Sequence, residues 1–382
     1  MEPTNVASIP TGATGRPSPK LENETPVARD RQVGWALVGL GKLTLGELLP
    51  AFANTRYCKL TALVSGNPEK AREVAAQQGL EADAVYDYAG FDRIALDQQV
   101  EVVYLVLPNA LHADYTIRAL RAGKHVLCEK PMATTVEQCE SMIGAAEEAK
   151  RKLMIAYRAQ FEPHNIDAMR RIRSGELGRL RAVVTDTGRS TDPGDPADEW
   201  RLRRNLAGGG SLIDIGIYGL NAARYLTGEE PVEVRAQIQN PPQDPRFREV
   251  EDVVAWQLRF PSGLLANGTS SYSYVDTSRF EVIGTEGRIT MDPATPYRGN
   301  RLLIRTAEGE HEPRLQPVNQ FAREMDHLSE AIMRGTEVTT PGEEGLQDVR
   351  LMPAIYQSAR TGRPAPTDWG YRRRIDPAAG RI

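Results

Sequence analysis

Short apolar runs alternate with amphipathic segments through the first third of the chain. Five apolar runs are expected to form strands: Val33–Val38, Leu60–Val64, Val102–Leu107, His125–Cys128 and Leu153–Ala156. Between them, apolar residues recur at helical spacing, which predicts four helices: Leu43–Ala53, Pro68–Gln78, Leu111–Ala122 and Thr135–Lys150. This rhythm predicts a doubly wound parallel sheet that binds its ligand beyond the carboxyl ends of the strands.

The rhythm changes after about residue 156. A helix near Glu162–Ser174, a strand near Leu180–Thr187 and a helix over Ser211–Leu226 are expected first. Six strand-like segments then follow closely: Val232–Gln239, Asp252–Phe260, Leu264–Tyr272, Arg279–Ile283, Gly287–Met291 and Leu302–Arg305. Short turns between them favour a large, open and mostly antiparallel sheet. Two closing helices are predicted at Asn319–Arg334 and Glu343–Thr361.

The fold class predicted is therefore α/β, with two domains and an N-terminal arm. Residues 31–156 form a Rossmann domain, and residues 157–382 form an α+β domain for substrate binding and oligomerisation. Residues 1–30 are rich in proline and small residues, which resist helix and strand. This arm either is a disordered tail or wraps a neighbouring subunit.

Composition excludes several classes of partner. The 382 residues carry a net charge of −4, so there is no basic character to attract nucleic acid or an anionic membrane. Three cysteines and five histidines show no ligand spacing, so no metal is expected. The first thirty residues lack the apolar core of an export signal. The cytoplasm is the expected location, or the periplasm if a signal was removed.

A glycine loop follows the first predicted strand. It consists of Gly39, Leu40, Gly41, Lys42, Leu43 and Thr44. A strand, a glycine loop and a helix in this order place a pyrophosphate at the helix N-terminus. Thr44 stands where the motif has its third glycine, and a small residue there still allows close packing.

The second predicted strand ends without an acid, which bears on the choice of cofactor. NAD-binding folds usually place an acid there for the ribose 2′-hydroxyl. Here Ser65 and Gly66 follow the strand and Lys70 opens the next helix. A hydroxyl and an ammonium would accept a 2′-phosphate, so NADP(H) is the predicted cofactor. The alternative is that Ser65 is a turn residue and Lys70 a solvated helix residue.

Two further segments directly follow strands and should face the cofactor. One is Leu107-Pro108-Asn109, and the other is Glu129-Lys130-Pro131. The Lys130 ammonium is the candidate to meet the nicotinamide ring. Glu129 and Lys130 could instead be a solvated charge pair before a turn.

These segments resemble the glucose–fructose oxidoreductase / inositol dehydrogenase (Gfo/Idh/MocA) family of two-domain sugar dehydrogenases. The resemblance covers nearly all of the chain. It rests on the glycine loop, Ser65-Gly66-Asn67 and five further motifs: Cys128-Glu129-Lys130-Pro131-Met132, Trp200-Arg201-Leu202-Arg203-Arg204, Gly208-Gly209-Gly210-Ser211-Leu212, Asp214-Ile215-Gly216-Ile217-Tyr218 and Glu343-Glu344-Gly345. Most members carry a histidine four residues after the aspartate. Here that position is Tyr218, as in the glucose–fructose enzymes, which the chain resembles most within the family.

The resemblance implies a set of cofactor-lining residues: Tyr88, Leu107, Asn109, His112, Arg158, Trp200, Arg201 and Tyr297. For His112 the alternative is a capping or packing role. Arg201 binds phosphate or merely solvates a loop. Two more tyrosines, Tyr157 and Tyr272, either contact a sugar or pack in the core.

The predicted catalytic residues are Lys130, Asp214 and Tyr218. Asp214 and Tyr218 are four residues apart on a predicted helix and so share one face. Hydride loss from a sugar carbon also requires loss of a hydroxyl proton. A phenol is a poor base at neutral pH unless a cation stabilises its ionised form. Tyr218 would therefore be the general acid/base beside Lys130, and Asp214 would orient sugar hydroxyls or relay the proton. Tyr218 could instead be an ordinary half-buried aromatic.

The sequence thus predicts an NADP(H)-dependent oxidoreductase that oxidises an aldose such as glucose at C1 to the lactone. The resemblance implies NADP held so tightly that a second sugar, fructose or an aldose, is reduced to an alditol. One alternative is a dehydrogenase that releases NADPH. Another is a non-catalytic nucleotide sensor on the same fold. The open sheet should pack on a partner copy, so a homodimer or homotetramer is expected.

Overall fold

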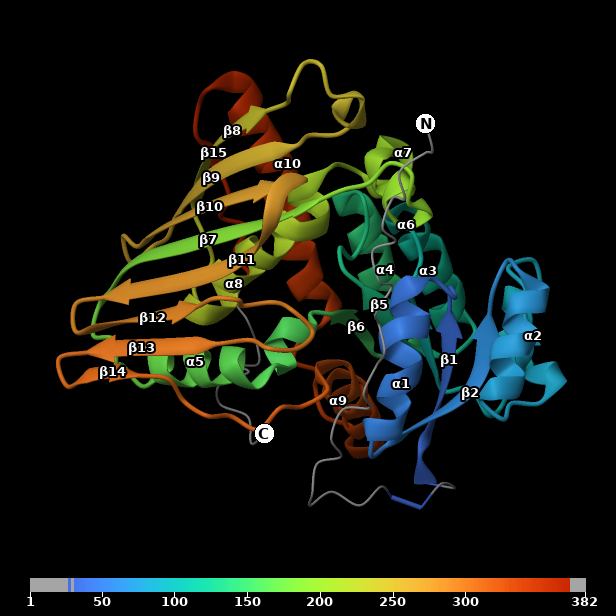
Figure 1. Ribbon diagram of the computed structural model, residues 1–382. Coiled ribbons are helices and arrows are strands. Elements are labelled where there is room, and N and C mark those ends of the chain that lie inside the picture. The colour runs from blue at the N-terminus through green and yellow to red at the C-terminus, as the bar shows by residue number, and fades with distance from the viewer. Residues whose placement is uncertain (1–26, 29–30, 372–382) are drawn as a thin grey trace, which may run out of the picture.

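The computed structural model describes residues 27–28 and 31–371, and most of the predicted arm lies outside them. Two sheets side by side organise the chain, one of six strands and one of nine (Figure 1). The predicted fold class, a parallel Rossmann sheet plus a mostly antiparallel sheet, is confirmed. No helix among the described residues is long and apolar enough to cross a membrane.

The six-stranded sheet has the strand order β3-β2-β1-β4-β5-β6, and all its strands are parallel. Its strands are β1 (Val33–Val38), β2 (Cys58–Val64), β3 (Val85–Tyr86), β4 (Val102–Leu105), β5 (His125–Glu129) and β6 (Leu153–Ala156). Its helices are α1 (Leu49–Ala51), α2 (Pro68–Gln77), α3 (His112–Arg121) and α4 (Val136–Ala149). The order reverses between β1 and β4, which is where a doubly wound sheet binds its ligand.

The central strand β1 shows why this sheet is covered on both faces. All six of its residues are buried. Trp35 and Leu37 pack in the cluster that holds α1 and α9 (Gln320–Arg334). Ala36 and Val38 pack in the cluster that holds α3 and α4. Because successive side chains alternate, an unbroken apolar run is what a parallel strand between two helical layers requires.

The nine-stranded sheet has the order β14-β13-β12-β11-β7-β10-β9-β8-β15, and only β7 and β10 pair in parallel. Its strands are β7 (Leu180–Ser190), β8 (Glu233–Gln239), β9 (Val253–Arg259), β10 (Leu265–Ser271), β11 (Ser273–Gly284), β12 (Gly287–Met291), β13 (Leu302–Thr306), β14 (Gly309–His311) and β15 (Ala365–Pro366). The helices of this part of the chain, besides α9, are α5 (Pro163–Arg173), α6 (Pro196–Glu199), α7 (Arg204–Ala207), α8 (Ile217–Thr227) and α10 (Gly342–Thr361).

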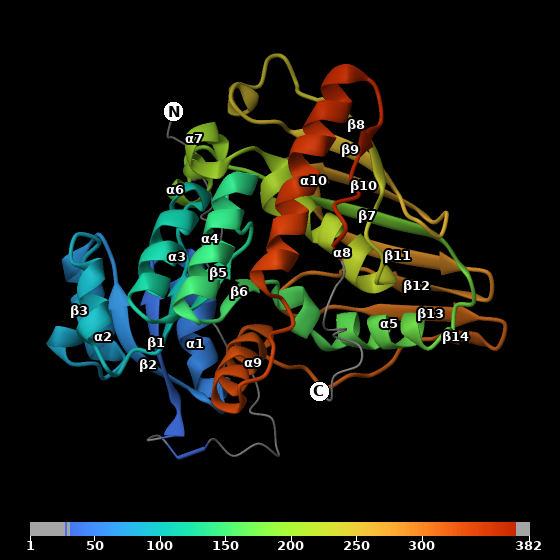
Figure 2. The same ribbon diagram turned by 180° about the vertical axis from the view of Figure 1, so that it is seen from behind.

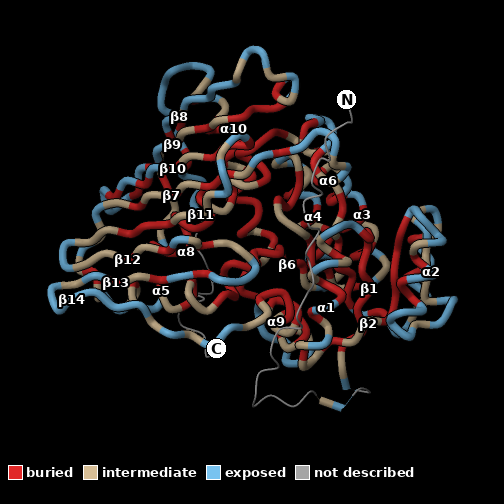
Figure 3. The backbone as a smooth tube through the Cα atoms, in the orientation of Figure 1, coloured by how far each residue is buried: buried red, intermediate tan, exposed pale blue. Residues whose placement is uncertain are grey.

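Among the described residues, helices cover only one face of this larger sheet. Seen from behind, α5, α8 and α10 lie across it, whereas the face toward the viewer in Figure 1 carries none (Figure 2). Along β9, Val254, Trp256 and Leu258 are buried while Gln257 and Arg259 are exposed, as one-sided burial requires. Figure 3 shows this mixture of buried and exposed positions along the strands.

The predicted elements differ from the structure mainly at helix starts and short elements. The predicted helices over Leu43–Ala53 and Ser211–Leu226 both begin with a π-helical turn, Thr44–Leu48 and Leu212–Gly216. Strand β4 ends two residues earlier than predicted, at Leu105. The elements β3, β14, β15, α6 and α7 were not predicted, because two to four residues are too few to show a period.

A buried arginine ties α8 to α10, the helix that crosses from the larger sheet to α4. Arg224 has no exposed surface and meets three carboxylates: Glu230 at 2.7 Å, Asp348 at 2.6 Å and Glu344 at 3.2 Å. Burial raises the pKa of Asp348 to about 6, although Arg224 acts against this shift. Among the described residues, Arg224 is thus a counter-charge that the three carboxylates share.

We predict that Arg224→Met destabilises the fold by about 3–5 kcal/mol, because buried carboxylates lose their counter-charge. The exposed pair Arg259–Glu233, 3.3 Å apart, offers a matched control, and Arg259→Met should cost at most about 1 kcal/mol. Urea and thermal unfolding of both variants measure the difference. Equal losses would contradict this view of the cluster.

Candidate functional site

The glycine loop after β1 is shaped for a phosphate group. Gly39 has φ +97°, and a Cβ atom there would lie 2.2 Å from the Val106 carbonyl oxygen. Thr44, at the third glycine position, donates its hydroxyl to the Gly39 carbonyl at 2.6 Å and so closes the loop. A Cβ atom on Gly41 would meet no atom within 4 Å, which leaves open space beside the backbone. The loop therefore fits a pyrophosphate at the start of a helix.

The end of β2 lies beside this loop. Lys70 donates its ammonium to the Leu40 carbonyl at 2.6 Å, and the Ser65 hydroxyl accepts from the Asn67 amide at 3.1 Å. A Cβ atom on Gly66 would lie 3.1 Å from the Tyr88 ring, so this ring walls the same corner. The structure thus brings Ser65, Gly66, Lys70 and Tyr88 together next to the glycine loop.

Lys130, at the end of β5, reaches across to the second domain. Its ammonium donates to the Asp214 carbonyl at 2.5 Å and lies 3.4 Å from the Asp214 carboxylate. The same ammonium stands 4.8 Å from the centre of the Tyr218 ring. The three predicted catalytic residues therefore meet, although Asp214 lies in the π-helical turn and Tyr218 in α8.

Four donors surround the buried Asp214 carboxylate. Besides Lys130, these are Arg201 at 3.0 Å, the Tyr272 hydroxyl at 3.1 Å and Arg189 at 3.5 Å. Burial alone would raise the pKa of Asp214, but the Arg201, Lys130 and Arg189 cations hold it well below its ordinary value. A carboxylate so strongly held in its charged form anchors its neighbours and is a poor proton acceptor.

The Tyr218 hydroxyl is held by a different cation. Arg158 donates to the Tyr218 oxygen at 2.9 Å, and its guanidinium also lies 5.0 Å from the centre of the Tyr218 ring. Among the described residues this oxygen only accepts, so its own proton is free for an incoming oxygen. Lys130 thus contacts the ring alone, while Arg158 contacts both the ring and the hydroxyl oxygen.

Three more of the predicted residues lie at or just after the ends of β4 and β5, and each makes a polar contact with another part of the chain. Glu129 accepts from the Tyr104 hydroxyl at 2.8 Å, and Asn109 donates to the Ala207 carbonyl at 2.8 Å. His112 is buried, and its ring nitrogens lie 2.8 and 2.9 Å from the carbonyls of Pro131 and Leu107. His112 therefore contacts the loops after both β4 and β5, between which the predicted cofactor-lining residues lie.

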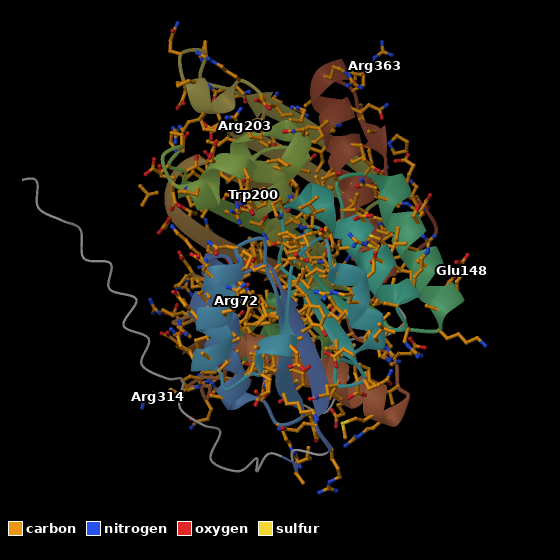
Figure 4. All side chains as sticks on the ribbon, turned by 90° about the vertical axis from the view of Figure 1, so that its right-hand side faces the viewer. Arg72, Glu148, Trp200, Arg203, Arg314 and Arg363 are labelled. Atoms are coloured by element: carbon orange, nitrogen blue, oxygen red, sulfur yellow. The ribbon has the colours of Figure 1, made fainter. Side chains whose placement is uncertain are left out.

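A segment of the second domain lies over the Rossmann loops. It carries α6, Trp200, Arg201 and α7, and Figure 4 shows Trp200 and Arg203 on it. The Arg201 guanidinium stacks on the Trp200 ring at 4.3 Å. Lys42 of the glycine loop forms an ion pair with Asp195, at the start of α6. The segment thus contacts the loop that is shaped for phosphate.

Further side chains complete the surroundings. Tyr297, partly exposed, lies over the Arg158 guanidinium at 4.5 Å. Tyr272 is buried with its hydroxyl on Asp214, and Tyr157 is buried beside Asp348, away from the site. Arg189, which also pairs with Asp198 at 2.7 Å, was not singled out from the sequence. The sequence signal that could have found Arg189 is a cationic residue near the end of a predicted strand in the second domain.

Comparison with known proteins places the chain in a family. Residues 33–157 match the model of an oxidoreductase family with an NAD-binding Rossmann fold. Residues 170–367 match the model of that family's C-terminal alpha/beta domain. The chain belongs to the Gfo/Idh/MocA family of oxidoreductases. The resemblance drawn from its motifs is confirmed.

Three relatives illustrate the similarity. A D-xylose 1-dehydrogenase [NADP(+)] from Haloarcula marismortui is 35% identical over 341 residues, 87% of this chain and 93% of the relative. An inositol 2-dehydrogenase from Rhizobium meliloti is 27% identical over 85% of this chain and 96% of its own. The crystal structure of aldose-aldose oxidoreductase from Caulobacter crescentus, complexed with glycerol, is 49% identical with a TM-score of 0.85. It covers 88% of this chain and 100% of its own.

Proposed function

We propose that the protein is an NADP(H)-dependent sugar oxidoreductase that oxidises an aldose at C1 to the aldonolactone. The arrangement of Tyr218 between Arg158 and Lys130, at the carboxyl edge of the Rossmann sheet, carries this proposal. The similarity to a xylose dehydrogenase and to an aldose-aldose oxidoreductase supports the sugar substrate. An intact set of Lys130, Asp214 and Tyr218 weighs against a non-catalytic nucleotide sensor.

Two transfers are needed to turn the C1 alcohol of an aldose into a lactone. A nicotinamide nucleotide, when bound, accepts the hydride from C1. Tyr218 takes the hydroxyl proton, since its side chain is partly exposed, Arg158 contacts its oxygen and Lys130 contacts its ring. Lys130 and Arg158 stabilise the phenolate that accepts this proton. In the reverse direction Tyr218 returns a proton to the carbonyl oxygen of the second sugar.

Asp214 acts on this chemistry indirectly, by positioning its neighbours. Its carboxylate fixes Lys130, Arg201 and Tyr272 in place. The alternative is that Asp214 is the base and Tyr218 only packs. The two assignments differ in what a conservative substitution at each position should do.

Tyr218→Phe removes only the hydroxyl. We expect turnover with glucose to fall on the order of 10²–10⁴-fold while cofactor binding survives, because general acid/base catalysis is worth about that much. The melting temperature should not change. Measurement of kcat across several aldoses checks this without assuming one sugar.

Asp214→Asn is the comparison variant. It leaves three cations around a neutral amide, so it should lower the melting temperature as well as the activity. A Tyr218→Phe enzyme within about threefold of wild type would move the role of base to Asp214.

The cofactor is proposed to be NADP(H) rather than NAD(H). The corner formed by Ser65, Lys70 and the Tyr88 ring offers a hydroxyl and an ammonium and no carboxylate at the strand end. A 2′-phosphate is a dianion that such a pair would bind by charge-assisted hydrogen bonds.

Lys70→Ala should weaken NADP(H) binding by about 1–3 kcal/mol, the worth of a hydrogen bond to a charged group. NAD(H) binding should change little. Lys59→Ala, at the opposite end of β2, is the control and should alter neither. Fluorescence titration with both reduced nucleotides decides, and equal affinity of the wild-type protein for the two would refute the assignment.

We also propose that the nucleotide is held through successive turnovers, so that one sugar is oxidised and a second reduced. Three contacts cross the nucleotide side of the molecule: Lys42 to Asp195, Glu47 to Arg298 at 2.9 Å, and Asn109 to Ala207 at 2.8 Å. They would close the second domain over the glycine loop. The rival is a dehydrogenase that releases NADPH after each turnover.

The combined variant Asp195→Asn with Arg298→Met should lose its nucleotide faster, because both charged contacts are weakened or broken. The new asparagine side chain can still accept from the Ala197 amide at the helix start, so α6 should keep its cap. The nucleotide retained after dialysis, measured by absorbance, reports the effect. Arg301→Met, which breaks the exposed pair with Glu312, is the control. Equal retention by wild type, the combined variant and the control would show that these contacts do not hold the cofactor.

The open face of the nine-stranded sheet is the proposed surface for a homodimer or homotetramer. No helix of the described residues covers it, and the exposed side chains of Gln257 and Asn267 are hydrogen-bonded on it at 2.9 Å. A large sheet face without a covering layer is typically buried by a second copy of the chain.

A further inference from the structure

Arg158 is a buried cation without a carboxylate partner among the described residues. The side chain follows β6, in a 3₁₀ turn (Arg158–Phe161), and only 7% of its surface is exposed. No carboxylate oxygen of a described residue lies within salt-bridge distance of it. Its hydrogen-bond acceptors are the Thr295 carbonyl, the Gln320 side-chain oxygen and the Tyr218 hydroxyl, and all three are neutral. Buried arginines are ordinarily paired with an anion, whereas this one has no described carboxylate at salt-bridge distance, and Glu129 acts on it only from further away.

The protein fixes the direction of this guanidinium. One nitrogen donates to Thr295 at 2.7 Å and to Gln320 at 2.8 Å, and Gln320 is itself held by its donation to the Tyr297 carbonyl at 2.9 Å. The Tyr297 ring stacks on the guanidinium. The other terminal nitrogen is thereby aimed at the Tyr218 oxygen. Geometry this constrained adds little reorganisation cost when charge appears on that oxygen.

The charged groups around Tyr218 leave Arg158 as the nearest source of positive charge to the oxygen. Lys130 faces the ring and bonds to Asp214, whose carboxylate is already surrounded by cations. Behind Arg158, burial raises the pKa of Glu129, and burial with the nearby Glu129 raises the pKa of Glu324. Both carboxyls are therefore held toward their neutral forms. Tyr297, the remaining titratable neighbour, is a phenol whose pKa burial raises to about 12.

We propose that Arg158 is a positioning residue that holds the ionised form of Tyr218 ready to take the substrate proton. The phenolate would supply the anion that the buried guanidinium lacks. Lys130 contacts the Tyr218 ring and Asp214, whereas Arg158 contacts the Tyr218 oxygen. This inference rests on the proposed role of Tyr218 as general acid/base, and it adds which side chain sets the pH range in which that role operates.

The test is the pH dependence of aldose oxidation by Arg158→Met. The rise of kcat with pH should move upward by roughly one to two pH units, which is a loss of about ten- to a hundredfold near neutral pH. The rate should recover toward the wild-type value at alkaline pH. Arg158→Lys keeps the charge and should shift the profile less. A uniform loss at every pH, or an unshifted profile, would overturn the proposal.

Two further variants keep the test decisive. If Arg158→Met does not fold, Gln320→Met releases one anchor of the guanidinium and should shift the profile in the same direction; no shift there refutes the proposal. In a Tyr218→Phe background, Arg158→Met should change kcat by at most about twofold, because Arg158 acts through the phenol. Full activity of Tyr218→Phe would refute the proposed role of Tyr218 as general acid/base. Its loss, with an unshifted Arg158→Met profile, would refute only this inference.

Discussion

The buried carboxylate of Asp214 is the point on which the site depends. It receives Arg201 and Arg189 from its own domain, Lys130 from the end of β5 in the Rossmann domain, and the Tyr272 hydroxyl. A buried charge must be matched by good geometry to be tolerated, so these contacts fix the two domains against each other where the cofactor strands end. Loss of this anion would leave three cations close together. The same interaction sets the direction of the Lys130 side chain, whose ammonium lies over the Tyr218 ring.

The contacts around Asp214 and those around the Tyr218 hydroxyl involve different cations. Lys130 and Asp214 form the structural contact between the domains, and Arg158 addresses the Tyr218 oxygen from the opposite side. Each partner comes from a different element, so no short motif contains the whole arrangement. The contacts of Lys42 and Asn109 with the segment around α6 and α7 add a second closure on the nucleotide side. In the proposed function, proton exchange and cofactor retention would be served by separate contacts of the same two domains.

The sequence predicted well those features that depend on local pattern. The unbroken apolar run of β1 and the alternation along β9 are enough to define both sheets. The positions of Lys130 and Gly39 follow from their place directly after strands. The pairing of Asp214 with Arg189 could not be predicted, since it depends on the register that brings β7 beside the π-helical turn. The contacts of His112 also needed the structure, because its ring nitrogens lie against the carbonyls of two separate loops. The role proposed for Arg158 depends on its contacts in the structure, where its acceptors among the described residues are neutral.

This site is proposed to move a hydride and a proton between a sugar and a bound nicotinamide. The most direct test is the absorbance spectrum of the purified, dialysed full-length protein, recorded before and after addition of glucose and then of fructose. The account predicts a nicotinamide band that stays with the protein, changes to the reduced form with the first sugar and returns to the oxidised form with the second. A set of other aldoses tried in turn extends the test beyond glucose. Protein that is saturated with NADP and shows no reduction with any aldose would contradict the account.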